Sequence, residues 1–119
     1  MKILIVDDAS FMRMTIKNHL TKHGYEVVGE AENGLIGVQK FTELKPDIVT
    51  MDVTMPEMDG LEALTEIMKL DPKAKVVLIT AMGQENVAVK AIQSGAKGFV
   101  VKPFKEDVLI NAIKRAENL

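Results

Sequence analysis

Five short apolar runs separated by helical segments constrain the fold of this chain more than any other feature of its sequence. The runs cover residues 3–6, 26–31, 47–52, 76–80 and 98–101. In the first, third and fourth runs apolar residues follow one another without alternation, which is typical of strands that are covered on both faces. We therefore expect five strands in one sheet with helices on both sides.

Between these runs, apolar residues recur with the three- and four-residue spacing of helices. The shared faces are Phe11, Met12, Thr15, Ile16 and Leu20 before Gly24; Leu61, Leu64, Ile67 and Met68 after Gly60; and Val108, Leu109, Ala112, Ile113 and Ala116. Residues 33–44 and 84–94 have less clear spacing, but they fill the remaining gaps. Five strands that are each followed by a helix predict an α/β domain of (βα)5 type, a doubly wound parallel five-stranded sheet.

Polar residues follow the predicted strands at the edge where ligands bind in such sheets. The first strand ends in Asp7 and Asp8, the third in Asp52, the fourth in Thr80, and the fifth runs into Lys102. Taken singly, each also fits a structural role, such as capping the helix that begins near Ser10. Together, three carboxylates at one edge repel each other unless a cation lies among them.

An all-oxygen ligand set predicts Mg²⁺ as that cation, because the chain has no cysteine and both histidines, His19 and His23, lie on the first helix. Asp52 ends the central strand and precedes a proline-containing loop rather than a helix that it could cap. A carboxylate beside Mg²⁺, a lysine and a hydroxyl is suited to accept a phosphoryl group. Asp52 needs no general base, since aspartate is ionised at neutral pH.

Composition excludes several other classes of protein. The 119 residues carry 15 Lys and Arg against 17 Asp and Glu, a net charge of -2, so no basic excess favours direct nucleic-acid binding. No apolar run approaches the roughly 20 residues of a membrane span, and the N-terminus lacks the features of a signal peptide. We expect one domain over residues 1–119, in the cytoplasm and without membrane insertion.

Four motifs, IVDDASFMR, TMDVTMPEMDG, ITAMG and GAKGFVVKPF, resemble those of the receiver domains of two-component response regulators, and most of all the stand-alone chemotaxis regulators. The resemblance covers essentially the whole chain and implies the flavodoxin-like strand order 2-1-3-4-5. It implies that Asp8, Asp52 and the backbone carbonyl of Thr54 bind Mg²⁺ directly, while Asp7 acts through metal-bound water. It also implies that Asp52 is phosphorylated, that Thr80, Lys102 and the backbone N–H of Ala81 contact the phosphoryl group, and that the Lys102–Pro103 bond is cis.

The family couples the threonine at the site to an aromatic residue on the fifth strand, which is Phe99 here. By resemblance, Thr80 moves toward the phosphoryl group and the Phe99 ring turns inward, which changes the surface of the fourth helix, fifth strand and fifth helix. A phenylalanine buried in the core is the alternative interpretation. Thr54 and Met82, which flank the phosphoryl position, are predicted to tune the rate of dephosphorylation without taking part in phosphorylation.

The function implied is a signalling switch that accepts a phosphoryl group from a sensor histidine kinase and then binds a downstream protein, such as the flagellar motor switch. It is expected to be a monomer and no enzyme beyond its own phosphorylation and dephosphorylation. Alternatives are a receiver domain cut from a longer regulator, a phosphorelay intermediate, a haloacid-dehalogenase-type phosphatase and a nucleotide-binding module. The last two are disfavoured, because Thr54 replaces the phosphatase's second aspartate and no phosphate-binding glycine motif occurs.

Overall fold

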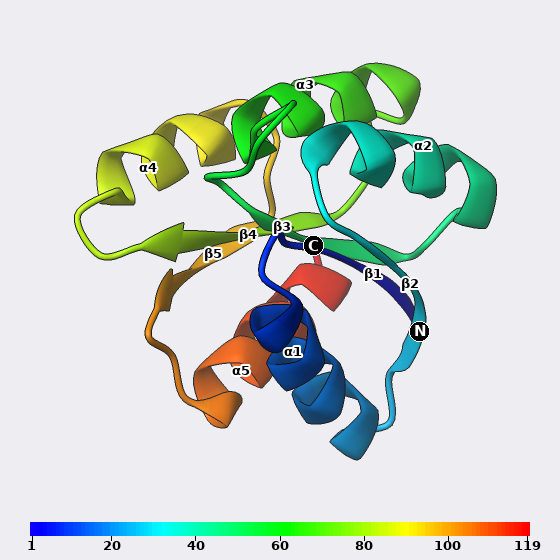
Figure 1. Cartoon of the computed structure of the whole chain (residues 1–119), viewed down its shortest axis with the longest axis vertical. Helices are drawn as coiled ribbons and strands as arrows, with labels where there is room; N and C mark the ends of the chain where they lie inside the picture. The colour runs from blue at the N-terminus through cyan, green and yellow to red at the C-terminus, as the bar shows by residue number, and fades with distance from the viewer.

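The five strands form one parallel sheet in the order β2-β1-β3-β4-β5, as predicted (Figure 1). The computed structural model describes all residues from 1 to 119. The strands are β1 (Lys2–Val6), β2 (Glu26–Ala31), β3 (Ile48–Asp52), β4 (Val76–Ala81) and β5 (Gly98–Lys102). The helices are α1 (Ser10–Lys22), α2 (Gly34–Leu44), α3 (Gly60–Leu70), α4 (Glu85–Gln93) and α5 (Glu106–Glu117).

Alternation of side chains along the central strands builds one apolar core on each face of the sheet. Val6, Met51 and Leu78 point into a core that α2, α3 and α4 cover, whereas Ile5 and Ile79 point into a core under α1 and α5. Figure 1 shows the two groups of helices on opposite sides of the sheet. All five residues of β3 are buried, because this strand is central and covered on both faces.

Local sequence signals set the ends of the helices. The side chain of Asn33 caps α2 by accepting a hydrogen bond from the N–H of Ile36 at 2.8 Å. The chain leaves α1 through Gly24, whose φ of 86° favours glycine. Residues 33–44 and 84–94, where the apolar spacing was least clear, contain the helices α2 and α4 as predicted.

The predicted apolar face of the first helix is wrong at one position. Ile16 and Leu20 are buried, but Phe11 is 77% exposed. The side of α1 that faces the core carries Met12, Ile16 and Leu20, which are spaced four residues apart, and Phe11 is turned by about 100° from this stripe. No helix has the length and apolar character that crossing a bilayer requires.

Candidate functional site

The register of the sheet brings the predicted site residues to one edge. Val6 pairs with Met51, so Asp7 and Asp52 each follow paired positions of β1 and β3. Asp52 pairs with Ile79, and Ala81 pairs with Lys102. Because all strands are parallel, these residues meet at the carboxyl edge of the sheet, as predicted from the sequence.

Three carboxylates form a compact acidic cluster at this edge. One oxygen each of Asp7, Asp8 and Asp52 lies within 4.8 Å of the others. Asp7 is 1% exposed and Asp52 6% exposed, whereas Asp8 is on the surface. The Nζ atom of Lys102 lies 3.4 Å from Asp7 Oδ2 and 3.4 Å from Asp52 Oδ1. The lysine thus bridges the two buried carboxylates.

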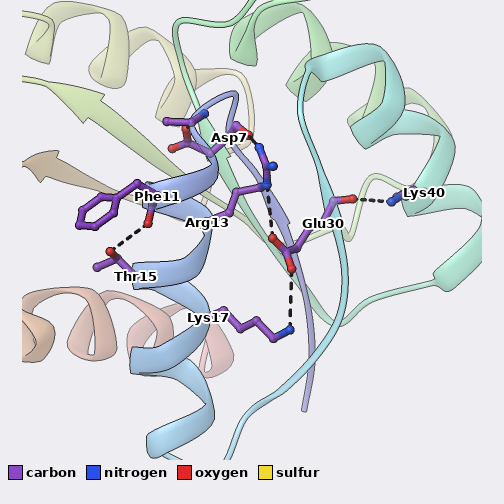
Figure 2. A network of polar contacts seen from close by, with 8 residues as sticks. Asp7, Phe11, Arg13, Thr15, Lys17, Glu30 and Lys40 are labelled. Atoms are coloured by element: carbon purple, nitrogen blue, oxygen red, sulfur yellow. Dashed lines mark hydrogen bonds and ion pairs between the residues drawn. The ribbon is translucent and has the colours of Figure 1, made fainter.

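Asp7 is held by partners on every polar atom. Its N–H donates to the carbonyl of Ala31 at 3.0 Å, and its Oδ1 accepts from the N–H of Ala9 at 2.9 Å. Its backbone carbonyl accepts from Nη1 of Arg13 at 2.6 Å (Figure 2). The exposed carboxylate of Asp8 has no such partner and is open to solvent. Neither aspartate caps α1 by its side chain, since the N-cap is Ala9.

The electrostatics of the cluster favour a bound cation. Burial, followed by repulsion from Asp7 and Asp8, raises the pKa of Asp52 to about 6, although Lys102 opposes the shift. A divalent cation among the three carboxylates would relieve both the repulsion and the loss of hydration. The oxygen-only donors fit Mg²⁺, which takes one or two carboxylates together with waters and phosphate oxygens.

The loop from Val53 to Asp59 folds back closely over the end of β3. The N–H of Gly60 donates to the carbonyl of Val53 at 2.8 Å, and a Cβ atom on Gly60 would lie 2.3 Å from the carbonyl oxygen of Asp52. Only glycine fits this close approach. Within the loop, the backbone carbonyl of Thr54 accepts no backbone hydrogen bond, which leaves it free as the predicted metal ligand.

The end of β4 carries the two groups that were predicted to donate to the phosphoryl group, the hydroxyl of Thr80 and the N–H of Ala81. Thr80 is fully buried and its Oγ1 has no hydrogen-bond partner, which is also true of Thr50 in β3 but is uncommon for buried hydroxyls. The N–H of Ala81 donates to Oε1 of Gln84 at 3.4 Å. Gln84 Nε2 in turn donates to Thr54 Oγ1 at 3.4 Å. Gln84 therefore connects two predicted site residues.

The predicted switch and rate-tuning positions lie on the surface. Phe99 is 39% exposed, so the alternative of a core phenylalanine is wrong. The ring borders a pocket of about 240 Å³. Its lining residues are Ile92, Lys97, Gly98, Phe99, Ala112 and Arg115.

Met82 is 75% exposed and Thr54 is exposed as well. The Lys102–Pro103 bond is cis, as the resemblance implied.

Four polar contacts were not predicted from the sequence, and two of them are near the site. Arg13 binds Asp7, and Gln84 binds Ala81. Away from the site, Glu106 of α5 pairs with His19 of α1 at 3.1 Å and with His23, the C-cap of α1, at 3.0 Å. Both histidines pair with Glu106, which lies near the other end of the chain, so the spacing of residues in the sequence did not indicate this pairing. Arg13 offered a weak signal, because it lies within the IVDDASFMR motif.

Comparisons with known proteins agree with this geometry. The model of the response regulator receiver domain matches residues 3–114. Chemotaxis protein CheY of Listeria monocytogenes is 59% identical over 98% of this chain and 98% of its own length. The protein of the same name from Thermotoga maritima is 56% identical over 96% of this chain and 95% of its own.

A solved structure supports the same assignment. The CheX-CheY-BeF3-Mg complex from Borrelia burgdorferi matches with a TM-score of 0.91 at 35% identity, over 94% of this chain and 85% of that chain. The extent of these matches, together with the sheet order and the acidic cluster at its carboxyl edge, shows that the chain belongs to the family of response regulator receiver domains.

Proposed function

We propose that this protein is a phosphorylation-activated switch of a two-component system, acting in chemotaxis, with Asp52 as its phosphoacceptor. The observation that carries the proposal is the position of Asp52, whose carboxylate lies beside those of Asp7 and Asp8 and beside the ammonium group of Lys102. The identity of 56% to 59% with chemotaxis proteins named CheY over nearly the whole chain supports the chemotactic role.

The chemistry proposed for the site is transfer of a phosphoryl group from a phosphohistidine of a sensor histidine kinase. An oxygen of Asp52 attacks the phosphorus, the P–O bond forms as the P–N bond to the histidine breaks, and the histidine nitrogen leaves with the electron pair. Lys102 neutralises charge on the transferring group, and the hydroxyl of Thr80 and the N–H of Ala81 donate to its oxygens. Mg²⁺ held by Asp8, Asp52, the Thr54 carbonyl and, through water, Asp7 would supply further positive charge.

The output proposed for the switch starts at Thr80, whose buried hydroxyl has no partner. Its movement toward the phosphoryl group would satisfy that hydroxyl and open space for the half-exposed ring of Phe99. The surface of α4, β5 and α5 would then change its affinity for a downstream protein. The Borrelia relative was solved with CheX, and we propose a partner of the chemotaxis apparatus here, such as the flagellar motor switch.

We also propose that residues 1–119 act as one monomeric receiver domain that catalyses only its own phosphorylation and dephosphorylation. Thr54 and Met82 would set the lifetime of the phosphoryl group. A phosphatase that acts on external substrates would instead turn over a generic phosphate monoester.

Beryllium fluoride with Mg²⁺, a stable mimic of the phosphoryl group, tests the switch. We expect amide resonances of Thr80, Phe99 and α4 to shift in the wild type and to stay in place in Asp52→Asn. Shifts of equal size in the variant would contradict the proposal. Continuous release of phosphate from p-nitrophenyl phosphate would favour the phosphatase.

A further inference from the structure

Arg13 is the one cation that contacts the backbone of the acidic cluster. Its side chain is 18% exposed and reaches from α1 back to the end of β1, where Nη1 donates to the carbonyl oxygen of Asp7 at 2.6 Å. Figure 2 shows the guanidinium group between this carbonyl and Glu30 of β2. Lys102, by contrast, contacts only the carboxylates of the cluster.

The carbonyl that Arg13 binds belongs to the peptide unit that joins Asp7 to Asp8. Because a peptide unit is planar, a hydrogen bond that fixes its oxygen also fixes the direction in which the chain enters Asp8. Asp8 has no side-chain partner of its own, so its position depends on this backbone. The Arg13 contact therefore acts on the residue that is proposed to bind Mg²⁺ directly.

The guanidinium group is itself held in place by Glu30. Arg13 Nε lies 3.3 Å from Glu30 Oε1, and the fixed fork of the guanidinium lets one side chain bind both Glu30 and Asp7. Glu30 is anchored in turn, since Lys40 donates to its backbone carbonyl and Lys17 lies 3.8 Å from its Oε2. Figure 2 shows the chain of contacts from α2 through β2 to the end of β1.

We propose that Arg13, oriented by Glu30, is a positioning residue that holds the Asp7–Asp8 peptide in the arrangement that binds Mg²⁺. The inference rests on the proposed function, because it concerns the same metal site. Partners of this kind, which orient metal ligands without touching the metal, typically change metal affinity by about 10- to 100-fold when removed.

The sign of the effect separates positioning from simple electrostatics. A positive charge near a cation site repels the metal. If Arg13 acts only through its charge, removal of Arg13 therefore strengthens Mg²⁺ binding. Positioning means the opposite, because the loss of the Arg13 contact leaves Asp8 less well placed. A variant that weakens Mg²⁺ binding although it removes a positive charge therefore identifies the positioning role.

The test is Mg²⁺ binding by isothermal titration calorimetry to the wild type and to Arg13→Met, Arg13→Lys and Lys17→Met. Methionine keeps the apolar stem of Arg13 and removes the donors and the charge. Lys17→Met is the matched control, since it removes a positive charge from the same helix and the same glutamate but no contact to Asp7. Melting without metal checks that each variant is folded, and the Asp8 amide resonance reports on the peptide directly.

We expect Arg13→Met to raise the dissociation constant for Mg²⁺ about tenfold and to shift the Asp8 amide resonance without metal, whereas Lys17→Met leaves both nearly unchanged. Binding by Arg13→Met as tight as that of the wild type, or equal weakening in Lys17→Met, would overturn the proposal. If Arg13→Met does not fold, the Mg²⁺ affinity of Arg13→Lys is the deciding measurement. Lysine keeps the positive charge but lacks the planar guanidinium that binds Asp7 and Glu30 together. Wild-type Mg²⁺ affinity of Arg13→Lys therefore overturns the proposal, and weaker Mg²⁺ binding supports it.

Failure of this inference is distinct from failure of the proposed function. If the wild type binds Mg²⁺ and is phosphorylated while Arg13→Met binds the metal equally well, only the role of Arg13 is wrong. If the wild type itself neither binds Mg²⁺ nor accepts phosphoryl from acetyl phosphate, the proposed function is wrong.

Discussion

Lys102 Nζ lies 3.4 Å from Asp52 Oδ1 although the two residues belong to β5 and β3, which β4 separates in the sheet. The lysine side chain is long enough to cross the end of one intervening strand, and it also reaches Asp7, which directly follows β1. One ammonium group thus joins three strands at the carboxyl edge. This arrangement places a positive charge beside the proposed phosphoacceptor before any ligand arrives.

The two neighbouring aspartates should differ in their effect on metal affinity. We expect Asp8→Ala to weaken Mg²⁺ binding much more than Asp7→Ala, because the exposed carboxylate of Asp8 is free while both oxygens of Asp7 already accept hydrogen bonds or pair with Lys102. Calorimetry measures the affinity directly. A second readout is the rise in melting temperature with Mg²⁺, since a ligand that binds the folded state stabilises it.

Glu43→Gln controls for the loss of a surface charge in that comparison, because Glu43 is exposed on α2 and away from the site. Equal Mg²⁺ affinities of the two aspartate variants would count against the proposed ligand set. A melting temperature of the wild type that does not change with millimolar Mg²⁺ would also count against it.

Met82 should affect the lifetime of the phosphoryl group. We expect Met82→Ala to change the dephosphorylation rate by about tenfold, equivalent to roughly 1.4 kcal/mol in barrier height, because the side chain is proposed to overhang the path of the attacking water. Since Met82 is 75% exposed, its loss should change stability little. Decay of phosphorylated protein after donor removal, followed beside a melting curve, tests both expectations. An unchanged decay rate would remove Met82 from the mechanism.

The burial of Asp52 predicts a stability gain on neutralisation. Its folded pKa is about 6 against an ordinary 3.8, so between these values the folded state binds the proton that the unfolded state has lost. The cost of the charged carboxylate is therefore fully present above pH 6 and is relieved as the pH falls toward 3.8. We expect metal-free Asp52→Asn to be more stable than the wild type near neutral pH, by on the order of 1–2 kcal/mol.

Urea unfolding in EDTA at several pH values measures this difference. The gain should shrink steadily on acidification. A gain that stays constant in acid would mean that the charge of Asp52 is not its cause.

Glu106 should stabilise the contact between α1 and α5. Its hydrogen bond to His23 and the nearby charges of Lys22 and His19 hold the pKa of Glu106 below its usual 4.5, against a smaller opposing effect of burial. The stabilisation is therefore present above 4.5 and is lost as the pH falls through the lowered value. We expect Glu106→Gln to reduce the melting temperature near neutral pH by on the order of 2–4 °C, and to have no effect in stronger acid.

Asp107→Asn is the matched control for this prediction, since Asp107 is an exposed acid in the same first turn of α5 but has no ion pair. Equal loss in both variants would indicate that only the charge near the helix terminus matters.

The fold and the edge residues were predictable from the sequence because both follow from periodicity. Uninterrupted apolar runs marked the buried strands, and parallel strands necessarily bring Asp7, Asp52, Thr80 and Lys102 to one edge. The contacts of Arg13, Gln84 and Glu106 were not predictable. They depend on side-chain conformations and on how two elements pack, which no spacing along the chain encodes. Phe11 was placed on the wrong face because helical spacing alone does not show how wide the buried stripe of a helix is, and the stripe here is narrow, with Met12, Ile16 and Leu20.

The most direct test of the account is the intact mass of the wild type and of Asp52→Asn after incubation with acetyl phosphate, with Mg²⁺ and with EDTA. Asparagine keeps the shape of the side chain but cannot act as the nucleophile. We expect one added phosphoryl group on the wild type with Mg²⁺, and none on the wild type in EDTA or on the variant. Full labelling of Asp52→Asn would contradict the assignment of Asp52 as the phosphoacceptor.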